Sequence, residues 1–287
     1  MDETAISANI RAAFVAACRL DVAALKPGNV HQYADGHGMR VEDFLASAEA
    51  AAPALCRAGA PLGQRLLDAV AATRAAVGCN TNLGILLLCA PLALAAGRRP
   101  GAALSESVAE ALDSLDMRDA ELACRAIALA DPGGLGDAGE HDVRRPPRLG
   151  LVAAMALAAP RDRIAQLYAD DFADLFAFTL PLLQYRLAAG DAIEAATTAL
   201  YLAILARWPD SHLLRKFGDS AAQSVTREAA GLLVRLRAEG AVPARIDMLL
   251  DWDKRLKQRG FNPGTSADLA VATLFAHGLM HMQEALA

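Results

Sequence analysis

One stretch of the sequence, Arg74–Arg98, limits the possible folds most strongly, because no charged residue lies between its two ends. Its second half is an unbroken apolar run, Ile85–Ala96. The run is shorter than the roughly 20 residues that a bilayer span needs, and it contains Pro91. A helix that is apolar all round has to be shielded from water on every side. We therefore predict a helix over about residues 81–96, buried at the centre of the protein.

The remaining sequence favours an all-α fold. Apolar residues make up 54% of the 287 residues, aromatic residues only 5%, and most of the apolar content is Ala and Leu, which are strong helix formers. Apolar positions recur every three or four residues, whereas alternation typical of strands is not sustained anywhere. No linker or composition shift marks a boundary, so we predict one domain, residues 1–287, built as a multi-helix bundle around the helix at 81–96.

The other predicted helices follow from the same spacing and from the Pro and Gly residues that interrupt it. We expect Pro181 to kink or divide one of them. The predicted ranges are 4–25, 42–57, 62–77, 104–112, 118–130, 149–159, 161–188, 191–206, 209–217, 219–239, 243–259 and 265–286.

Charge and cysteine content exclude several classes of protein. The net charge is −5, and no basic stripe with interleaved aromatic residues is present, which argues against a nucleic-acid partner. The start of the chain is acidic rather than basic, so we expect no signal peptide, and no run is long enough to span a membrane. The five cysteines form no C-x-x-C pair. We therefore expect a cytoplasmic protein with buried, reduced thiols. Its large Ala/Leu helices are compatible with a homodimer.

Four polar clusters stand out from this apolar background. The first is Lys26-Pro27-Gly28-Asn29, with His31, His37 and Asp43 following it. Pro-Gly-Asn is common in turns, so a solvated loop explains the pattern. The alternative is functional: Lys26 is a point charge for phosphate, and the histidines and Asp43 transfer protons or bind a metal ion. The segment 26–39 is long for a loop without secondary structure, which is typical of functional loops.

The second cluster is Asn80-Thr81-Asn82-Leu83-Gly84, directly before the apolar run. In one interpretation Asn80 is the N-cap of the buried helix. In the other, the free N–H groups and the positive dipole end of the helix face an anion such as phosphate. The two interpretations are compatible with each other.

The third and fourth clusters lie further along the chain. The third, Gly133–Asp142, combines the three glycines of Gly133-Gly134-Leu135-Gly136 with Asp137, Glu140, His141 and Asp142, and it indicates either a flexible surface loop or a Mg²⁺ site. The fourth is Asn262–Leu269. In the structural interpretation, Thr265 or Ser266 is the N-cap and the charge of Asp268 favours the helix start. In the functional interpretation, this segment is a second helix N-terminus rich in N–H and hydroxyl donors.

Taken in order, these motifs resemble the triphosphoribosyl-dephospho-CoA synthase family along nearly the whole chain. The motifs are Lys26–Val30, Asp43-Phe44 with Ser47, Asn80–Gly84, Gly133–Gly136, His141–Val143 and Asn262–Leu269. The resemblance implies an all-α transferase that moves the triphosphoribosyl group of ATP to a hydroxyl group of 3′-dephospho-CoA and releases adenine. The implied partners are ATP, a small hydroxyl acceptor and Mg²⁺.

The resemblance also implies roles for individual residues. For proton transfer it implies Asp21, His31, His37 and Asp43. For the metal ion it implies Asp137 and Asp142, with Asp43 as a further candidate. For substrate binding, mainly around the phosphates, it implies Lys26, Pro27, Gly28, Asn29, Asn80, Thr81, Asn82, Gly84, Lys216, Asn262, Gly264, Thr265 and Ser266.

The chain departs from the family pattern at two places. Asn80-Thr-Asn-Leu-Gly84 replaces the Asn-Thr-His-Lys-Gly typical of the citrate-lyase branch, so Leu83 removes a cation that could face phosphate. Gly38-Met39 replaces that branch's Asp-Met pair. One alternative is therefore ribosyl-phosphate transfer in the synthesis of methanopterin-type cofactors. Another is a non-catalytic helical protein that binds nucleotide or CoA.

Overall fold

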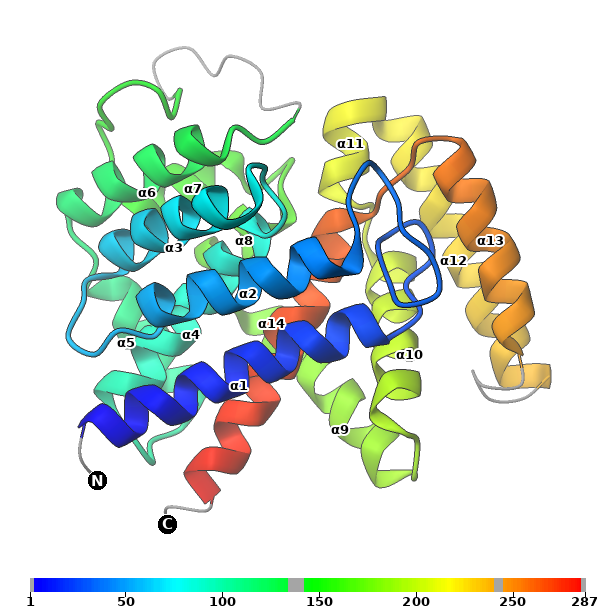
Figure 1. Cartoon of the computed structure of the whole chain (residues 1–287), viewed down its shortest axis with the longest axis horizontal. Coiled ribbons are helices and arrows are strands. Elements are labelled where there is room, and N and C mark those ends of the chain that lie inside the picture. Colours follow the sequence, from blue (N-terminus) through cyan, green and yellow to red (C-terminus); the bar gives the residue numbers. More distant parts are fainter. Residues whose placement is uncertain (1–2, 134–141, 240–244, 285–287) are drawn as a thin grey trace.

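The computed structural model describes residues 3–133, 142–239 and 245–284, and within them the fold is all-α with no strand (Figure 1). The predicted fold class is confirmed. The helices are α1 Glu3–Ala23, α2 Val41–Leu55, α3 Leu62–Val77, α4 Leu83–Arg98, α5 Leu104–Asp113, α6 Met117–Ala130, α7 Leu151–Ala158, α8 Arg163–Ala169, the π-helical turn η2 Leu175–Thr179, α9 Leu180–Ala188, α10 Ile193–Arg207, α11 Ser211–Phe217, α12 Asp219–Glu239, α13 Ile246–Gln258 and α14 Gly264–Glu284.

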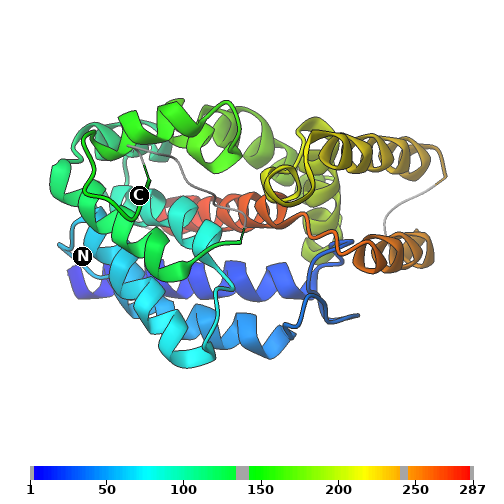
Figure 2. The same ribbon diagram turned by 90° about the horizontal axis from the view of Figure 1, so that it is seen from above.

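The predicted central helix is present as α4, which begins and ends two residues later than expected. Every residue of α4 from Leu83 to Ala96 is buried except Gly84. A second helix shares the centre: α14 passes through the middle of the bundle (Figure 2) and packs against α1, α4 and α10. The bundle therefore has two central helices, and their N-terminal ends meet.

The predicted helix at 161–188 is wrong as a single element. It consists of α8, the turn η2 and α9. The break lies at Asp171 and Phe172, which both have positive φ (52° and 61°), a conformation that no helix accommodates. Pro181, expected to kink or divide this segment, is the second residue of α9, two residues after the end of η2. A π-helical turn shifts the hydrogen-bond register, which suits a residue that cannot donate.

Helices α10–α13 enclose a second, smaller apolar core that includes Tyr201, Leu249 and Trp252. The pair α12 and α13 extends from one end of the molecule (Figures 1 and 2). This pair positions the site, because α13 contacts the loop between α1 and α2. That one domain covers 1–287 stays a prediction.

Two further expectations can be compared with the structure. Within the described residues, no helix has the length and apolar character needed to cross a membrane. The expectation of buried thiols was wrong for Cys79, which is exposed between α3 and α4, whereas Cys18, Cys56 and Cys89 are buried. Cys79 follows the αL residue Gly78 that ends α3, so it lies outside the packed helix faces.

Candidate active site

The loop between α1 and α2 is held from inside by Lys26. The side chain of Lys26 is fully buried, and its Nζ donates to Asp21 Oδ2 (2.6 Å), Asn29 Oδ1 (3.1 Å) and the carbonyl of Val30 (3.3 Å). Burial raises the pKa of Asp21, and the ion pair with Lys26 offsets part of this rise. Lys26 has no exposed surface, because its ammonium group is enclosed by these three acceptors. The phosphate contact predicted for Lys26 stays a prediction.

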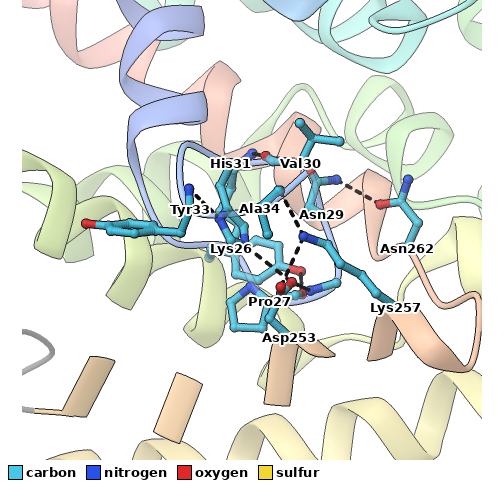
Figure 3. A network of polar contacts seen from close by, with 12 residues as sticks. Lys26, Pro27, Asn29, Val30, His31, Tyr33, Ala34, Asp253, Lys257 and Asn262 are labelled. Atoms are coloured by element: carbon cyan, nitrogen blue, oxygen red, sulfur yellow. Dashed lines mark hydrogen bonds and ion pairs between the residues drawn. The ribbon is translucent and has the colours of Figure 1, made fainter. Parts of the chain in front are cut away.

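Asp253 of α13 holds the same loop from outside (Figure 3). Its Oδ1 accepts the N–H of Gly28 (2.7 Å) and lies 3.2 Å from His31 Nε2, and its Oδ2 pairs with Lys257 Nζ (3.0 Å). Lys257 also donates to the carbonyl of Ala34 (3.0 Å). Desolvation alone would raise the pKa of Asp253, but its contacts with His31, Gly28 and Lys257 lower it overall.

His31 is fully buried in this network and has no exposed surface for a substrate. Its Nδ1 accepts the N–H of Tyr33 (3.3 Å), so Nε2 carries the hydrogen that faces Asp253. Burial lowers its pKa, which favours this neutral form. The proton-transfer role predicted for His31 stays untested, and the structure gives it a structural partner.

The loop is also tied to the start of α14. Asn29 Nδ2 donates to Asn262 Oδ1 (2.8 Å), and the hydroxyl of Tyr201 on α10 donates to the carbonyl of Pro27 (2.7 Å). Gly28 has φ +86°, and a Cβ there would lie 2.8 Å from Pro263 Cδ. Only glycine fits this close approach. The first and fourth polar clusters, more than 200 residues apart, therefore form one structure.

The second cluster lies at the N-terminus of α4. The N-cap residue is Asn82 and not Asn80 as expected, but the Asn80 side chain still accepts the N–H of Leu83 (3.1 Å). Thr81 donates to Ser47 Oγ on α2 (2.6 Å). Asn82 is 5% exposed, and its Oδ1 accepts from Thr73 (3.2 Å) while its Nδ2 has no partner among the residues described.

The starts of α4 and α14 touch at Gly84 and Asp268. A Cβ at Gly84 would lie 2.0 Å from Asp268 Oδ2, so the carboxylate rests directly on the Cα of Gly84. We call the region formed by Asn80–Ile85 and Gly264–Asp268 the α4–α14 junction. Asp268 is partly exposed, and within the described residues its carboxylate has neither a hydrogen bond nor an ion pair. Desolvation, followed by the charges of Asp210 and Asp21, raises its pKa well above the usual value.

The start of α14 differs from the expectation in its capping. The helix begins at Gly264, so Thr265 and Ser266 lie inside the first turn and are buried rather than N-caps. Ser266 donates through both N–H and Oγ to Asp210 Oδ2 (2.8 Å each). Asp210 is itself the N-cap of α11. Its burial raises its pKa, and these hydrogen bonds lower it in part.

Basic residues of α11 lie beside the junction. A Cβ at Gly264 would be 2.7 Å from His212 Nδ1, and one at Gly133 would be 3.0 Å from Lys216 Cε. Lys216 is exposed, so the predicted basic residue faces the start of the third cluster. Desolvation and the nearby charges of Lys216, Arg215 and His37 lower the pKa of His212 to about 4.

The remaining predicted residues have partners of their own. His37 is exposed and donates from Nε2 to the carbonyl of Gly28 (2.8 Å). Asp43 accepts the N–H of Arg40 (2.8 Å) and so caps α2. Asp142 accepts the N–H of Arg144 (2.8 Å) and pairs with its guanidinium (3.2 Å).

The predicted Mg²⁺ site is not assembled from the described residues. Asp137 lies outside them, and the carboxylate of Asp142 is occupied by Arg144. No group of three or more His, Cys, Asp or Glu side chains among the described residues could hold a metal ion. Binding of Mg²⁺ remains a prediction, and no chemical step below is assigned to it.

Two cavities lie outside the junction. One, of about 480 Å³, lies between α1 and α2 and is lined mainly by apolar residues such as Val22 and Leu45. The other, of about 200 Å³, lies beside the N-terminal part of α1 and the end of α4. Neither contains a residue of the α4–α14 junction.

Four residues that the sequence analysis did not assign are central to this geometry: Asp210, His212, Asp253 and Asp268. Asp268 belongs to the motif Asn262–Leu269, but was interpreted only as a charge near a helix start. Asp253 lies one turn before Lys257 on α13, which is rich in charged residues. Nothing in that local pattern distinguishes Asp253 from a solvated acid.

Comparison with known proteins identifies the family. Residues 7–286 match the family described as ATP:dephospho-CoA triphosphoribosyl transferase. The chain belongs to this family. The match confirms the resemblance noted in the sequence. It also confirms the predicted activity, the transfer of a triphosphoribosyl group from ATP to dephospho-CoA. No curated protein sequence matches the chain.

A solved structure with a similar fold supports the all-α architecture. It is a crystal structure from Archaeoglobus fulgidus, provisionally described as a triphosphoribosyl-dephospho-CoA synthase. The TM-score is 0.63 at 24% sequence identity, and the similarity covers 81% of this chain and 96% of the other. The transferase family and the helical architecture therefore agree.

Proposed function

We propose that this member of the transferase family carries out its reaction at the α4–α14 junction. The observation that carries the proposal is the contact between Gly84 and Asp268, which joins the second and fourth polar clusters. The first cluster joins them through the hydrogen bond between Asn29 and Asn262. A protein that used these motifs only as helix caps and turns would have no need to bring them together.

The N-terminus of α4 is the proposed contact for the triphosphate. The N–H of Leu83 is taken by Asn80, but the N–H groups of Gly84 and Ile85 have no acceptor among the described residues. The unpartnered Nδ2 of the buried Asn82 lies at the same helix end. Free N–H groups, an amide donor and a helix dipole together favour an anion.

Lys216 and His212 form the proposed basic side of the site. Lys216 is the proposed replacement for the cation that is absent at Leu83, because it is exposed and its charge acts on His212, which rests on Gly264. Its compact ammonium suits a phosphate oxygen. The loop Lys26–Asn29 then acts as the support that fixes Asn262 and the start of α14, rather than as a direct phosphate contact.

The test is release of adenine by the purified protein. It is incubated with Mg·ATP, with and without 3′-dephospho-CoA, and free adenine and the mass of the product are followed by chromatography and mass spectrometry. The proposal predicts adenine release that requires dephospho-CoA, and a product heavier by one triphosphoribosyl group. Two variants of Asn82 test the proposed triphosphate contact, with Asn82→Ala as the neutral control for Asn82→Asp. The negative charge added by Asn82→Asp should raise the KM for ATP more than Asn82→Ala does.

Other outcomes distinguish the alternatives. ATP binding by calorimetry without adenine release would favour another acceptor, such as a hydroxylated pterin precursor, which would then be tested in place of dephospho-CoA. Neither binding nor release would favour a non-catalytic helical protein. Residence in the cytoplasm, a homodimer and the absence of a nucleic-acid partner remain predictions.

A further inference from the structure

We infer that Asp268 and His212 form the acid–base pair of the transfer reaction: Asp268 protonates the departing adenine, and His212 takes the proton of the acceptor hydroxyl. This inference rests on the proposed function of the α4–α14 junction. It assigns chemical roles to two residues that the sequence motifs left without one.

The first argument is elimination among the acidic side chains nearby. Asp210 accepts four hydrogen bonds, from the N–H groups of His212, Leu213 and Ser266 and from the Ser266 hydroxyl. Asp253 accepts the N–H of Gly28 and pairs with Lys257.

The other predicted acids are also engaged. Asp21 is buried against Lys26, Asp43 caps α2 and Asp142 pairs with Arg144. Asp268 differs, since its carboxylate is partly exposed and unpartnered within the described residues. It is therefore the carboxyl group here that a substrate can reach without displacing a protein partner.

The second argument is the position of His212 relative to Asp268. His212 Nδ1 rests on Gly264, and Asp268 follows Gly264 by four residues on α14. Residues four apart lie on the same face of a helix, one turn from each other. Neither ring nitrogen of His212 has a hydrogen-bond partner among the described residues. Both groups therefore face one side of the start of α14.

The third argument is electrostatic and supports the assigned roles. Desolvation and the charges of Asp210 and Asp21 raise the pKa of Asp268, against the opposing charges of Arg215 and Lys26. The facing part of α4 contributes no charge, since its first charged residue is Arg98. The pKa of His212 is lowered to about 4. The raised pKa of Asp268 favours a carboxyl group that holds a proton to donate, and the pKa of about 4 leaves the imidazole of His212 neutral and able to accept one. Acid–base chemistry needs this arrangement.

The proton balance closes. The C1′–N9 bond of ATP breaks and its electron pair stays with adenine, which receives the Asp268 proton on a ring nitrogen. The acceptor oxygen forms its bond to C1′ and gives its hydroxyl proton to His212. Exchange with solvent water then returns a proton to Asp268 and removes one from His212. The sum is ATP plus acceptor hydroxyl giving the triphosphoribosyl O-glycoside of the acceptor and adenine.

The experiment compares two donors, ATP and 4-nitrophenyl riboside 5′-triphosphate, whose 4-nitrophenolate leaves without needing a proton. It is carried out after the wild-type protein has released adenine with dephospho-CoA; a wild type without this activity would count against the proposed function instead. Asp268→Asn should lower kcat with ATP about 100- to 10,000-fold, in the range of general acid catalysis, but less than about 10-fold with the nitrophenyl donor. His212→Gln should lower kcat equally with both donors.

Equal losses for Asp268→Asn with both donors, or no loss with ATP, would overturn the assignment of the acid. A loss for His212→Gln that disappears with the nitrophenyl donor would overturn the assignment of the base. The wild-type protein gives an independent measurement that no folding defect can disturb. Its kcat with ATP should fall as pH rises through the pKa of Asp268, whereas kcat with the nitrophenyl donor should not; the same fall with both donors would contradict the inference.

Discussion

The carboxylate of Asp268 rests on the Cα of Gly84, so that a methyl group at residue 84 would lie 2.0 Å from Oδ2. This contact fixes the position of Asp268 over the first turn of α4. Its counterpart at the other end of the helix is Gly97, where a methyl group would lie 3.7 Å from Ile10 Cδ1, an ordinary van der Waals contact. The two glycines of one helix thus give a matched pair of substitutions.

Gly84→Ala should displace Asp268 and lower kcat at least 10-fold, because misplacement of a reacting group by 1 Å can cost about 100-fold. Gly97→Ala should leave kcat unchanged and stabilise the protein by about 0.5–1 kcal/mol, since alanine loses less conformational entropy in a helix. Adenine release and urea unfolding measure the two effects. Full activity of Gly84→Ala would show that the contact does not position a reacting group.

Removal of the loop anchor Asp253 should destabilise the protein. Asp253→Ala leaves Lys257 without its counter-charge and Gly28 without its acceptor, which should cost about 3–5 kcal/mol in the free energy of unfolding. The control is Asp251→Ala on the same helix, whose carboxylate is exposed and 3.9 Å from Lys254, with an expected change below about 0.5 kcal/mol.

The pKa of Asp253 gives this anchor a pH dependence. It is lowered in the folded protein, so its contribution is present above the unfolded-state pKa of about 3.9 and is lost as pH falls through the folded pKa. In urea unfolding, the difference between wild type and Asp253→Ala should therefore shrink in acid below about pH 4. A difference that persists there would mean that the carboxylate charge is not what holds the loop.

The pH dependence of Asp268 should have the opposite sign. Its folded pKa is raised, so the protonated group stabilises the fold below the unfolded-state pKa of about 3.9, and this stability is lost as pH rises through the folded pKa. The side chain of the Asp268→Asn variant is neutral at every pH. The free energy of unfolding of this variant should therefore increase relative to that of the wild type as pH rises. A difference that does not change with pH, measured by urea unfolding in a series of buffers, would contradict the raised pKa.

The buried pair of Lys26 and Asp21 should matter for stability in an asymmetric way. Lys26→Met leaves the Asp21 carboxylate buried without its partner and should cost about 3–5 kcal/mol. The double variant Lys26→Met, Asp21→Leu removes both charges and should recover a large part of this loss in chemical unfolding. A double variant as unstable as the single one would indicate that the pair is needed for the shape of the loop itself.

Tyr201 offers a smaller test of the same loop. Tyr201→Phe leaves the buried carbonyl of Pro27 without its donor and should cost about 1–3 kcal/mol. Tyr185→Phe is the control, because that side chain is 69% exposed and should contribute nothing measurable. Thermal unfolding of the two variants makes the comparison, and equal melting temperatures would remove Tyr201 from the support of the loop.

The sequence by itself determined the helical fold and the buried helix α4. A charge-free run of this length is stable only inside a protein, and Pro and Gly stop helices through local sterics, so the helix positions are largely local properties. It also determined the family, because the ordered motifs extend over nearly the whole chain. The exception was the segment 161–188, where two residues with positive φ break a continuous apolar pattern.

Only the tertiary structure decided which polar residues meet. Sequence spacing carries no information on the pairing of Asp253 with a loop more than 200 residues away, or on the crossing of α4 and α14 at Gly84 and Asp268. It also decided that Lys26 and His31 are buried in structural networks, whereas Asp268 stays partly exposed. Burial and long-range contacts set the protonation and access of a side chain, and these arise only when the helices pack.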